Sequence, residues 1–468
     1  MQGKLKTFFK ETSFAVVSQS LSMAVGFALS IILPKFISVE SYGYWQLFIL
    51  YTGYVGFLHF GFIDGLYLKI GGEKFDNLDK NKLYPSMALM IILQVIIAII
   101  VIGTSCFVAH PVKRVLFAFL GLYVFVDNTY KLMSFILMAT GRINFYSKTV
   151  VIDKVLVAIM MTAILFLNPG INVGYLIGAF VLSHLAVLFV TWVEFKGVLL
   201  QGIKKIREIV PYYLDCVKVG AILMFANLCG SFIVGSGRFV IESFWDISVF
   251  AKVSLALALS SFMMAFISQI SYVLFPYLRN ASQETQSKVL SEGTFLMTLL
   301  GLVLFSMFFP LYFIIKLWLP QYQESLMFLL YIAPISLYEI KTTVLYNTFF
   351  RNLNKVKDLF YTNLASLILG CVFYAIAVLT HNIMLMIIGM LSAVIFRCLI
   401  MQVYLFKYYK VKLDSYTYVE FGITCFLLLS YAFGGLVALA VCYGVSILLF
   451  FVVYMSRLHG VKALFAER

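Results

Sequence analysis

The sequence contains very little charge. Only 12% of its 468 residues are Asp, Glu, Lys or Arg, whereas 62% are hydrophobic, and the mean hydropathy is +0.98. Soluble domains carry about 25% charged and about 45–50% apolar residues. A bilayer core about 30 Å thick is crossed by roughly 20 apolar residues in a helix, and the chain contains many continuous runs of that length. These runs are too long for barrel strands, so the composition predicts an all-α polytopic membrane protein.

The sequence also lacks the motifs of common enzymes. It contains no GxxxxGK[ST] loop for nucleotide phosphates, no HExxH pattern for zinc and no GxSxG nucleophile turn. Its seven cysteines lie in apolar runs and form no CxxC pair, so we interpret them as small core residues. The loops between apolar runs are short, which disfavours a membrane-bound glycan polymerase or ligase. We therefore predict a transporter rather than an enzyme, with no metal and no cofactor.

Fourteen apolar runs are predicted to span the membrane. They fall near 13–37, 43–67, 84–108, 115–138, 148–167, 173–193, 213–236, 249–274, 292–315, 324–348, 358–379, 382–404, 416–433 and 435–456. The stretch EFKGVLLQGIKKIREIVPY (194–212) alternates basic and apolar residues at helical spacing, which predicts an interfacial amphipathic helix ended by Pro211. It separates a six-helix lobe (1–193) from a second six-helix lobe (213–404), and residues 405–468 add two further spans and a tail.

The net charge of +14 suggests nucleic acid in a soluble protein, but the positions of the cations give another explanation. With a cytoplasmic N-terminus, most Lys and Arg residues fall at cytoplasmic ends of spans. The outer ends hold only Lys35, Lys113, Arg114, Arg238, Lys316 and, at the edge, Lys252. This positive-inside asymmetry predicts that both termini are cytoplasmic, and it requires no nucleic-acid partner. The first apolar run continues past Leu33 without a small-residue cleavage site, which predicts an uncleaved span.

Ionisable residues inside spans indicate candidate sites, because each costs about 2.5–3.5 kcal/mol at the helix centre. Asp127 and Lys131 are four residues apart on one helix face. They either neutralise each other against protein or form a polar wall of a wet cavity. We interpret His184 as a satisfied buried histidine. Snorkelling towards the cytoplasmic ends of the spans explains most of a further set, Asp153, Lys154, Lys218 and Arg397. Glu339 and Lys341 lie deeper in their span, and the sequence assigns them no role.

The stretch YTGYVGFLHFGFIDGLYLKIGG (51–72) combines a hydrophobic span with several glycines. Gly61 and Gly65 form a small-xxx-small step, which allows close backbone approach or bending. Asp64 and Lys69 would then lie at the cytoplasmic mouth of a cavity-lining helix. Plain helix packing with a snorkelled aspartate is the alternative interpretation.

Three cations lie at the predicted outer ends of spans one, seven and eight, where the positive-inside rule disfavours them. They are Lys35, Arg238 and Lys252. They serve either as interfacial anchors or as a basic collar that binds an anionic lipid head group.

Two stretches resemble a known family. The sequence LPKFISVESYGYWQLFILYTGYVGFLHFGFIDGLYLKIGG (33–72) resembles the start of a bacterial polysaccharide or O-antigen flippase. The sequence SGRFVIESFWDISVFAKVSLALALSSFMMAFISQISYVLFPYLRN (236–280) resembles the opening of that family's second lobe. Both contain a cation followed by phenylalanine and then an acidic, aromatic turn, which indicates a weak internal repeat. The family belongs to the multidrug/oligosaccharidyl-lipid/polysaccharide exporter superfamily.

The resemblance implies a V-shaped bundle of two six-helix lobes with two peripheral C-terminal helices and a cavity lined by spans one, two, seven and eight. It also implies a flippase in the bacterial cytoplasmic (inner) membrane. Such a protein moves undecaprenyl-pyrophosphate-linked oligosaccharides to the outer leaflet for capsule, O-antigen or exopolysaccharide assembly. Membrane lipids, a polysaccharide polymerase and other assembly proteins are its candidate partners. Alternating access is the mechanism expected for this layout.

The runner-up is a multidrug or metabolite antiporter of the same superfamily, coupled to Na⁺ or H⁺ through Asp64 or Asp127. The two functions differ in the charge that the cavity needs. A cationic drug requires carboxylates, whereas a pyrophosphate requires cations. The predicted cations Lys131, Lys35, Arg238 and Lys252 favour the anionic substrate, whose movement would use Na⁺, H⁺ or the membrane potential.

Overall fold

The structure, a computed structural model, describes residues 2–167, 172–196, 198, 206–268, 270–412 and 416–454. Within these ranges nearly every residue is helical and no strand occurs. The chain divides into two compact units. Unit 1 comprises Met1–Leu228 and Trp245–Ala251, and unit 2 comprises Cys229–Phe244 and Lys252–Arg468.

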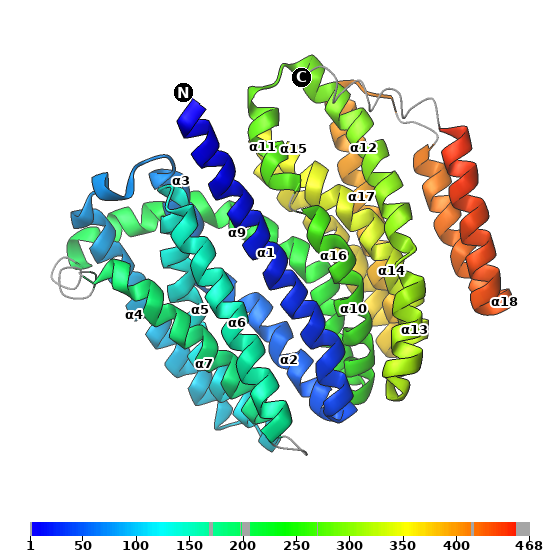
Figure 1. The fold of residues 1–468 in the computed structure, drawn as a ribbon, viewed down its shortest axis with the longest axis horizontal. Helices are drawn as coiled ribbons and strands as arrows, with labels where there is room; N and C mark the ends of the chain where they lie inside the picture. The colour runs from blue at the N-terminus through cyan, green and yellow to red at the C-terminus, as the bar shows by residue number, and fades with distance from the viewer. Residues whose placement is uncertain are drawn as a thin grey trace. The chain divides into compact units, whose positions relative to one another are not determined.

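Unit 1 consists of the helices that precede residue 229 and a short segment of the next helix. They are α1 (Gln2–Phe36), α2 (Val39–Val55), η1 (Gly56–His59), α3 (Phe62–Ile70), η2 (Phe75–Asn77), α4 (Lys80–Ser105), α5 (Pro111–Ala139), α6 (Ile143–Leu167), α7 (Val173–Trp192), η3 (Val193–Phe195) and the first part of α9 (Ile206–Phe244). α5 packs against α4 and α7, and α6 packs against α1 and α7 (Figure 1).

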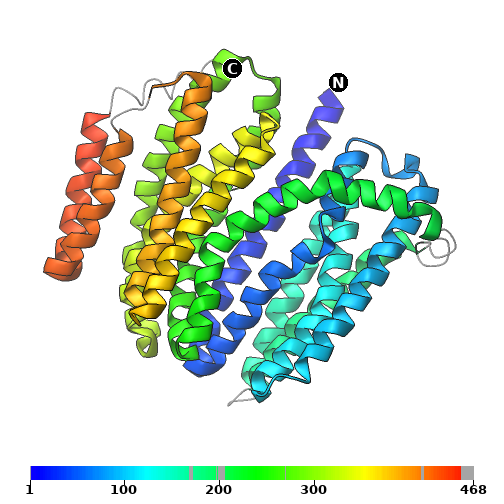
Figure 2. The ribbon, with the colours of Figure 1, turned by 180° about the vertical axis from the view of Figure 1, so that it is seen from behind.

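Unit 2 contains the end of α9 and the helices that follow. They are α10 (Ile247–Ser268), α11 (Ile270–Asn280), α12 (Gln283–Phe305), α13 (Phe308–Trp318), η5 (Pro320–Tyr322), α14 (Ser325–Ile340), the π-helical η6 (Lys341–Tyr346), α15 (Asn347–Asn352), α16 (Val356–Leu379), α17 (Ile383–Tyr409) and α18 (Tyr416–Val453). α16 and α17 lie side by side (yellow to orange in Figure 2), and α14 packs against α12 and α17.

The helices are consistent with the fourteen predicted spans. Eleven helices in the described ranges are long and apolar enough to cross a membrane, and the bent pair of α2 and α3 makes a twelfth. α10 contains a shorter apolar helix, Ile247–Phe262. α18 is broken at Gly435 (φ 64°, ψ −154°), and Figure 1 shows it as two antiparallel segments at the edge of unit 2. The chain is therefore an all-α, multi-pass membrane protein.

The predicted linker helix over 194–212 lies partly outside the described residues, which omit 197 and 199–205. α9 begins at Ile206 and continues through Pro211, so the prediction that a helix ends at this proline is wrong. Pro211 is near the start of α9, where its missing N–H removes only the hydrogen bond to the Arg207 carbonyl.

The two similar stretches found in the sequence lie at the first helix–helix junction of each predicted lobe. α1 ends at Phe36 and α2 begins at Val39, with the Ser38 hydroxyl accepting a hydrogen bond from the Ser41 N–H. Two residues separate the end of α9 at Phe244 from the start of α10 at Ile247. The internal repeat therefore corresponds to two short turns in equivalent places along the chain.

Candidate functional site

The second predicted span is broken near its middle. α2 ends at Val55, a 3₁₀ turn covers Gly56–His59, and α3 begins at Phe62. Between them Phe60 (φ 52°) and Gly61 (φ 85°) both adopt left-handed backbone conformations. Two such residues in succession turn the chain, and α3 runs at 57° to the preceding helix. The glycine-rich stretch therefore bends the span. Bending was one of the two roles predicted for these glycines.

The break frees backbone carbonyls, and two buried amide side chains bind them. The Asn128 amide on α5 donates to the Val55 carbonyl (3.1 Å) and to Gln94 Oε1 (2.8 Å). The Gln94 amide on α4 donates to the Leu58 carbonyl (3.0 Å). An unsatisfied carbonyl in the hydrocarbon region costs several kcal/mol, so these hydrogen bonds stabilise the bent conformation.

Gly61 and Gly65 also bring α3 against α9 within unit 1. A Cβ atom at Gly65 would lie 1.9 Å from the Cys216 carbonyl oxygen, and a Cβ at Gly220 would lie 2.0 Å from the Gly61 carbonyl oxygen. Both distances are far below a van der Waals contact, so only glycine fits. The small-xxx-small step predicted from the sequence therefore provides a close backbone contact as well as a bend.

Four ionisable side chains lie beside the bend. Lys131 Nζ is 2.6 Å from Asp127 Oδ2, and this ammonium lies so close to Gly56 that a Cβ there would be 2.7 Å from it. His59 Nδ1 accepts a backbone N–H at 3.0 Å, which leaves the proton on Nε2, 3.7 Å from Asp64 Oδ2. Spacing predicted the pairing of Asp127 with Lys131. The histidine beside Asp64 was not predicted.

Lys69 lies in the last turn of α3. Its positive charge is already paired with a carboxylate of the same unit. Its ammonium forms an ion pair with Asp215 of α9 and lies 4.7 Å from the centre of the Tyr212 ring. These contacts fasten α3 to α9 within unit 1.

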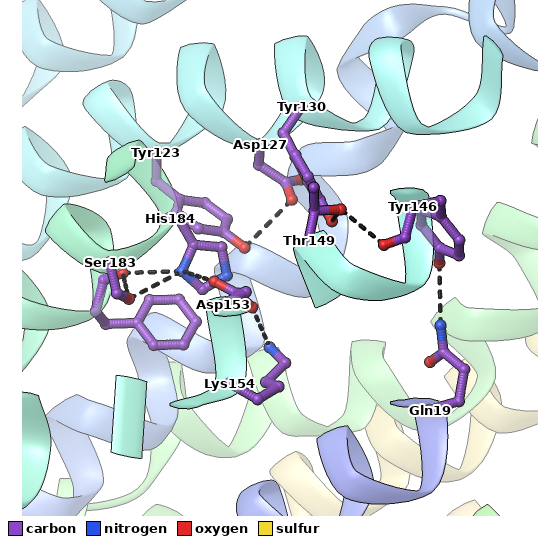
Figure 3. Close-up of polar contacts among 11 residues, drawn as sticks. Gln19, Tyr123, Asp127, Tyr130, Tyr146, Thr149, Asp153, Lys154, Ser183 and His184 are labelled. Atoms are coloured by element: carbon purple, nitrogen blue, oxygen red, sulfur yellow. Dashed lines mark hydrogen bonds and ion pairs between the residues drawn. The ribbon is translucent and has the colours of Figure 1, made fainter. Parts of the chain in front are cut away.

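A second polar cluster connects α5, α6 and α7. Figure 3 shows Asp153 between Lys154, whose Nζ lies 2.8 Å from Oδ2, and His184, whose Nδ1 lies 3.4 Å from Oδ1. His184 Nδ1 also lies 2.9 Å from a backbone carbonyl of its own helix, so it carries the proton. The Tyr123 ring packs edge-on against His184, and its hydroxyl donates to Asp127 (3.3 Å). Asp153 is buried rather than snorkelled, which corrects that prediction, and His184 has a carboxylate neighbour.

Unit 2 contains two ion pairs on one helix segment, one fully buried and one with a half-buried carboxylate. Glu339 of α14 pairs with Arg397 of α17, and Lys341 pairs with Glu420 of α18. The Arg397 residue is only 5% exposed, so the prediction that it snorkels to the cytoplasmic end is wrong. The arginine remains inside because α14 presents a carboxylate to it. A buried pair avoids the cost of an isolated buried charge.

A cavity of about 340 Å³ lies within unit 2 between α9, α10 and α14. Its wall is mostly apolar, and its polar groups are Ser260, Ser261 and Glu339. A few polar groups in an apolar concavity are typical of a small-molecule site. The sequence did not predict this cavity.

The three cations of the predicted collar lie in different surroundings. Lys35 is exposed in the last turn of α1 in unit 1. In unit 2, half-buried Arg238 donates to the Ser254 hydroxyl (3.1 Å), and Lys252 Nζ lies 2.8 Å from Glu324 Oε2. The helix positions agree with the sequence prediction. A common site for all three cations stays a prediction.

The comparisons with known proteins give a fold but no family. No protein-family model and no curated protein matches the sequence. A multidrug resistance MATE family transporter of the MOP superfamily, in an inward-facing conformation, matches with TM-score 0.60 and 15% identity, covering 84% of this chain and 96% of that chain. An outward-facing conformation of a multidrug resistance MATE family transporter of the MOP superfamily matches with TM-score 0.53 and 15% identity. This match covers 85% of this chain and 94% of that chain.

The lipid II flippase MurJ, in an inward closed conformation, matches with TM-score 0.63 and 13% identity, covering 94% of this chain and 99% of that chain. All three similar structures are transporters rather than enzymes. The chain therefore has the fold of MOP superfamily transporters.

The functional candidates that the sequence did not predict are pairs formed between helices. Asp153 with His184, Glu339 with Arg397, and Lys341 with Glu420 each join residues far apart in the chain. The available signal was the presence of opposite charges in separate apolar spans, because a buried charge requires a partner. Sequence spacing identifies such partners only within one helix.

Proposed function

We propose that this protein is a flippase that moves undecaprenyl-pyrophosphate-linked oligosaccharide repeat units from the cytoplasmic to the outer leaflet. The repeat units that reach the outer leaflet would serve capsule, O-antigen or exopolysaccharide assembly. The protein would work by alternating access, in which two lobes open in turn to each side of the membrane.

The observation that carries this proposal is the charge balance of the carboxylates. The three buried carboxylates among the described residues, Asp127, Asp153 and Glu420, each pair with a lysine. A cationic drug would have to displace one of these lysines before it could use the carboxylate. Among the collar cations, Lys252 is paired with Glu324, but that carboxylate is 68% exposed and an exposed ion pair contributes little. A pyrophosphate would therefore displace its competitor more easily than a cationic drug would displace a lysine from a buried carboxylate, so the balance favours an anionic substrate.

The extent of the structural likeness supports the same choice. The match to the lipid II flippase covers 94% of this chain, about a tenth more than the 84% of the inward-facing MATE transporter. A substrate with a lipid tail and a pyrophosphate is also what the collar of Lys35, Arg238 and Lys252 would suit, since phosphates bind fixed cations strongly.

The location and partners belong to the same proposal. The protein would reside in the bacterial cytoplasmic (inner) membrane with both termini in the cytoplasm, as the distribution of its Lys and Arg residues suggests. Its partners would be the lipid-linked glycan, membrane lipids, and a polysaccharide polymerase with other assembly proteins.

Two sources of free energy suit this substrate. Outward movement of an anion is favoured by an inside-negative potential, at about 2.3 kcal/mol per charge per 100 mV. Asp153 and His184 also lie 3.4 Å apart in a buried cluster, and chains of Asp, Glu and His inside membrane spans mark proton relays. We propose that this cluster couples proton entry to export.

The test of the function uses the collar cations of unit 2. Arg238→Ala and Lys252→Ala should each impair export of surface glycan in cells while leaving membrane insertion intact, because each charge-assisted contact contributes roughly 1.5–3 kcal/mol. Arg238→Lys should keep part of the activity if only charge matters, and little if a bidentate fork is used. Lys316→Ala on α13, which removes an exposed cation at another predicted outer end, is the matched control.

Normal export by the double alanine variant at native expression would mean that these cations are interfacial anchors. Hypersensitivity of a deletion strain to cationic dyes, with normal surface glycan, would instead favour the multidrug antiporter. The MATE-like fold and the buried pair of Asp153 and His184 favour that second candidate.

A further inference from the structure

The cavity in unit 2 presents hydrogen-bond acceptors to its interior. The Ser261 hydroxyl donates to the Leu257 carbonyl (2.8 Å), and the Ser260 hydroxyl donates to the Ile332 carbonyl (3.4 Å). With their protons directed to the backbone, both oxygens keep lone pairs for a ligand. Glu339 adds carboxylate oxygens to the same wall. A ligand of this cavity must therefore supply O–H or N–H donors.

The charge of the cavity excludes strongly charged ligands. Arg397 neutralises Glu339 in an ion pair whose arginine side chain is 6% exposed. A cation would have to compete with this arginine, and a phosphate would be repelled by the nearest group, which is the carboxylate. The suitable ligand is therefore neutral overall.

The rest of the wall is apolar. It includes Val234, Leu257 and Ile335. The C–H face of a pyranose ring or the methyl of an acetamido group packs against such side chains, while the ring hydroxyls reach acceptors at the edge. The volume of about 340 Å³ is at the small end of the range of roughly 300–1,000 Å³ for small-molecule sites.

We propose that this cavity binds a sugar residue of the transported glycan, through Ser260, Ser261 and Glu339. The inference rests on the proposed function and adds a separate site to it. The pyrophosphate would bind the collar cations, and the cavity would recognise the sugar.

The experiment uses the purified full-length protein in lipid nanodiscs and two probes. One probe is undecaprenyl pyrophosphate carrying a single N-acetylglucosamine, and the other is undecaprenyl pyrophosphate alone. The wild-type protein should bind the glycosylated lipid about tenfold more tightly, which corresponds to about 1.4 kcal/mol. Ile335→Phe, which fills the cavity, should bind both lipids equally and keep its affinity for the sugar-free lipid within about twofold.

Ser261→Leu is the second variant, because Ser261 lines the cavity and is an exposed residue rather than a core one. It should lose the same preference. Met327→Phe, at an exposed position of α14, is the control and should behave as the wild type. All variants should elute as monodisperse protein.

Each outcome bears on the proposal. A preference for the glycosylated lipid that persists in both filled variants, or no preference in the wild type, would overturn the sugar site while leaving the flippase intact. Failure of the wild type to bind either lipid would overturn the flippase itself, and the sugar site with it.

Discussion

The contact between α3 and α9 gives a prediction whose size follows from the structure. A Cβ added at Gly65 would lie 1.9 Å from the Cys216 carbonyl oxygen, whereas about 3.4 Å is needed for ordinary contact. The two backbones would have to separate by about 1.5 Å. Overpacking of this kind costs typically about 1–3 kcal/mol, and here the obstacle is backbone, which cannot rotate away. Gly65→Ala should therefore destabilise unit 1 by at least that amount.

The thermal midpoint of detergent-solubilised protein measures the effect. A loss of 1 kcal/mol shifts the midpoint of a domain of 150–250 residues by about 2–4 °C, so we expect a decrease of several degrees. Gly220→Ala should do the same, since its Cβ would lie 2.0 Å from the Gly61 carbonyl oxygen. Gly53→Ala is the matched control, because nothing lies within 4 Å of its added Cβ. Its midpoint should stay the same or rise slightly, as alanine favours the helix.

The double variant Gly65→Ala/Gly220→Ala should cost less than the sum of the single variants, because the first substitution already separates the helices. If Gly65→Ala and Gly220→Ala both retain the wild-type midpoint, the close approach of α3 and α9 is refuted.

Three further predictions concern buried polar groups. Lys341→Met should lower the thermal midpoint strongly, since removing one partner of a buried ion pair costs about 3–5 kcal/mol. Adding Glu420→Leu should restore most of the lost stability. A double variant as unstable as Lys341→Met alone would contradict this prediction. Asn128→Leu should cost about 1–3 kcal/mol by leaving the Val55 carbonyl without its partner, measured in the same assay, and an unchanged midpoint would show that the bend does not need this amide. In proteoliposomes, an outside-acid proton gradient should accelerate transport by the wild type but not by Asp153→Asn. Transport driven by the membrane potential alone should be unchanged in this variant. A proton response equal to that of the wild type would exclude Asp153 as the coupling group.

The sequence was sufficient to predict the helices because membrane spans are long and uniformly apolar. Each of the fourteen predicted spans overlaps a helix or half-helix of the structure, including the two halves of α18 at Gly435. The glycines in 51–72 also indicated the bend. Pro211 misled the prediction, because a proline near a helix start resembles one that ends a helix.

The candidate site was harder to predict from sequence. The i, i+4 spacing paired Asp127 with Lys131 correctly, since both lie on one helix. Arg397 was misplaced because its partner Glu339 lies on another helix, and Asp153 because His184, which lies beside it in addition to Lys154, belongs to another helix. No local pattern records which helices become neighbours, so pairs between helices and the cavity of unit 2 emerge only from the tertiary structure.

The most direct measurement of the central claim is the lipid-linked intermediate that accumulates when the protein is removed. In a deletion strain we expect undecaprenyl-pyrophosphate-linked repeat units to build up in the cytoplasmic leaflet, with loss of surface glycan and unchanged sensitivity to cationic dyes. Expression of the wild-type protein should reverse both effects. Normal surface glycan without any accumulated lipid-linked repeat units would contradict the account.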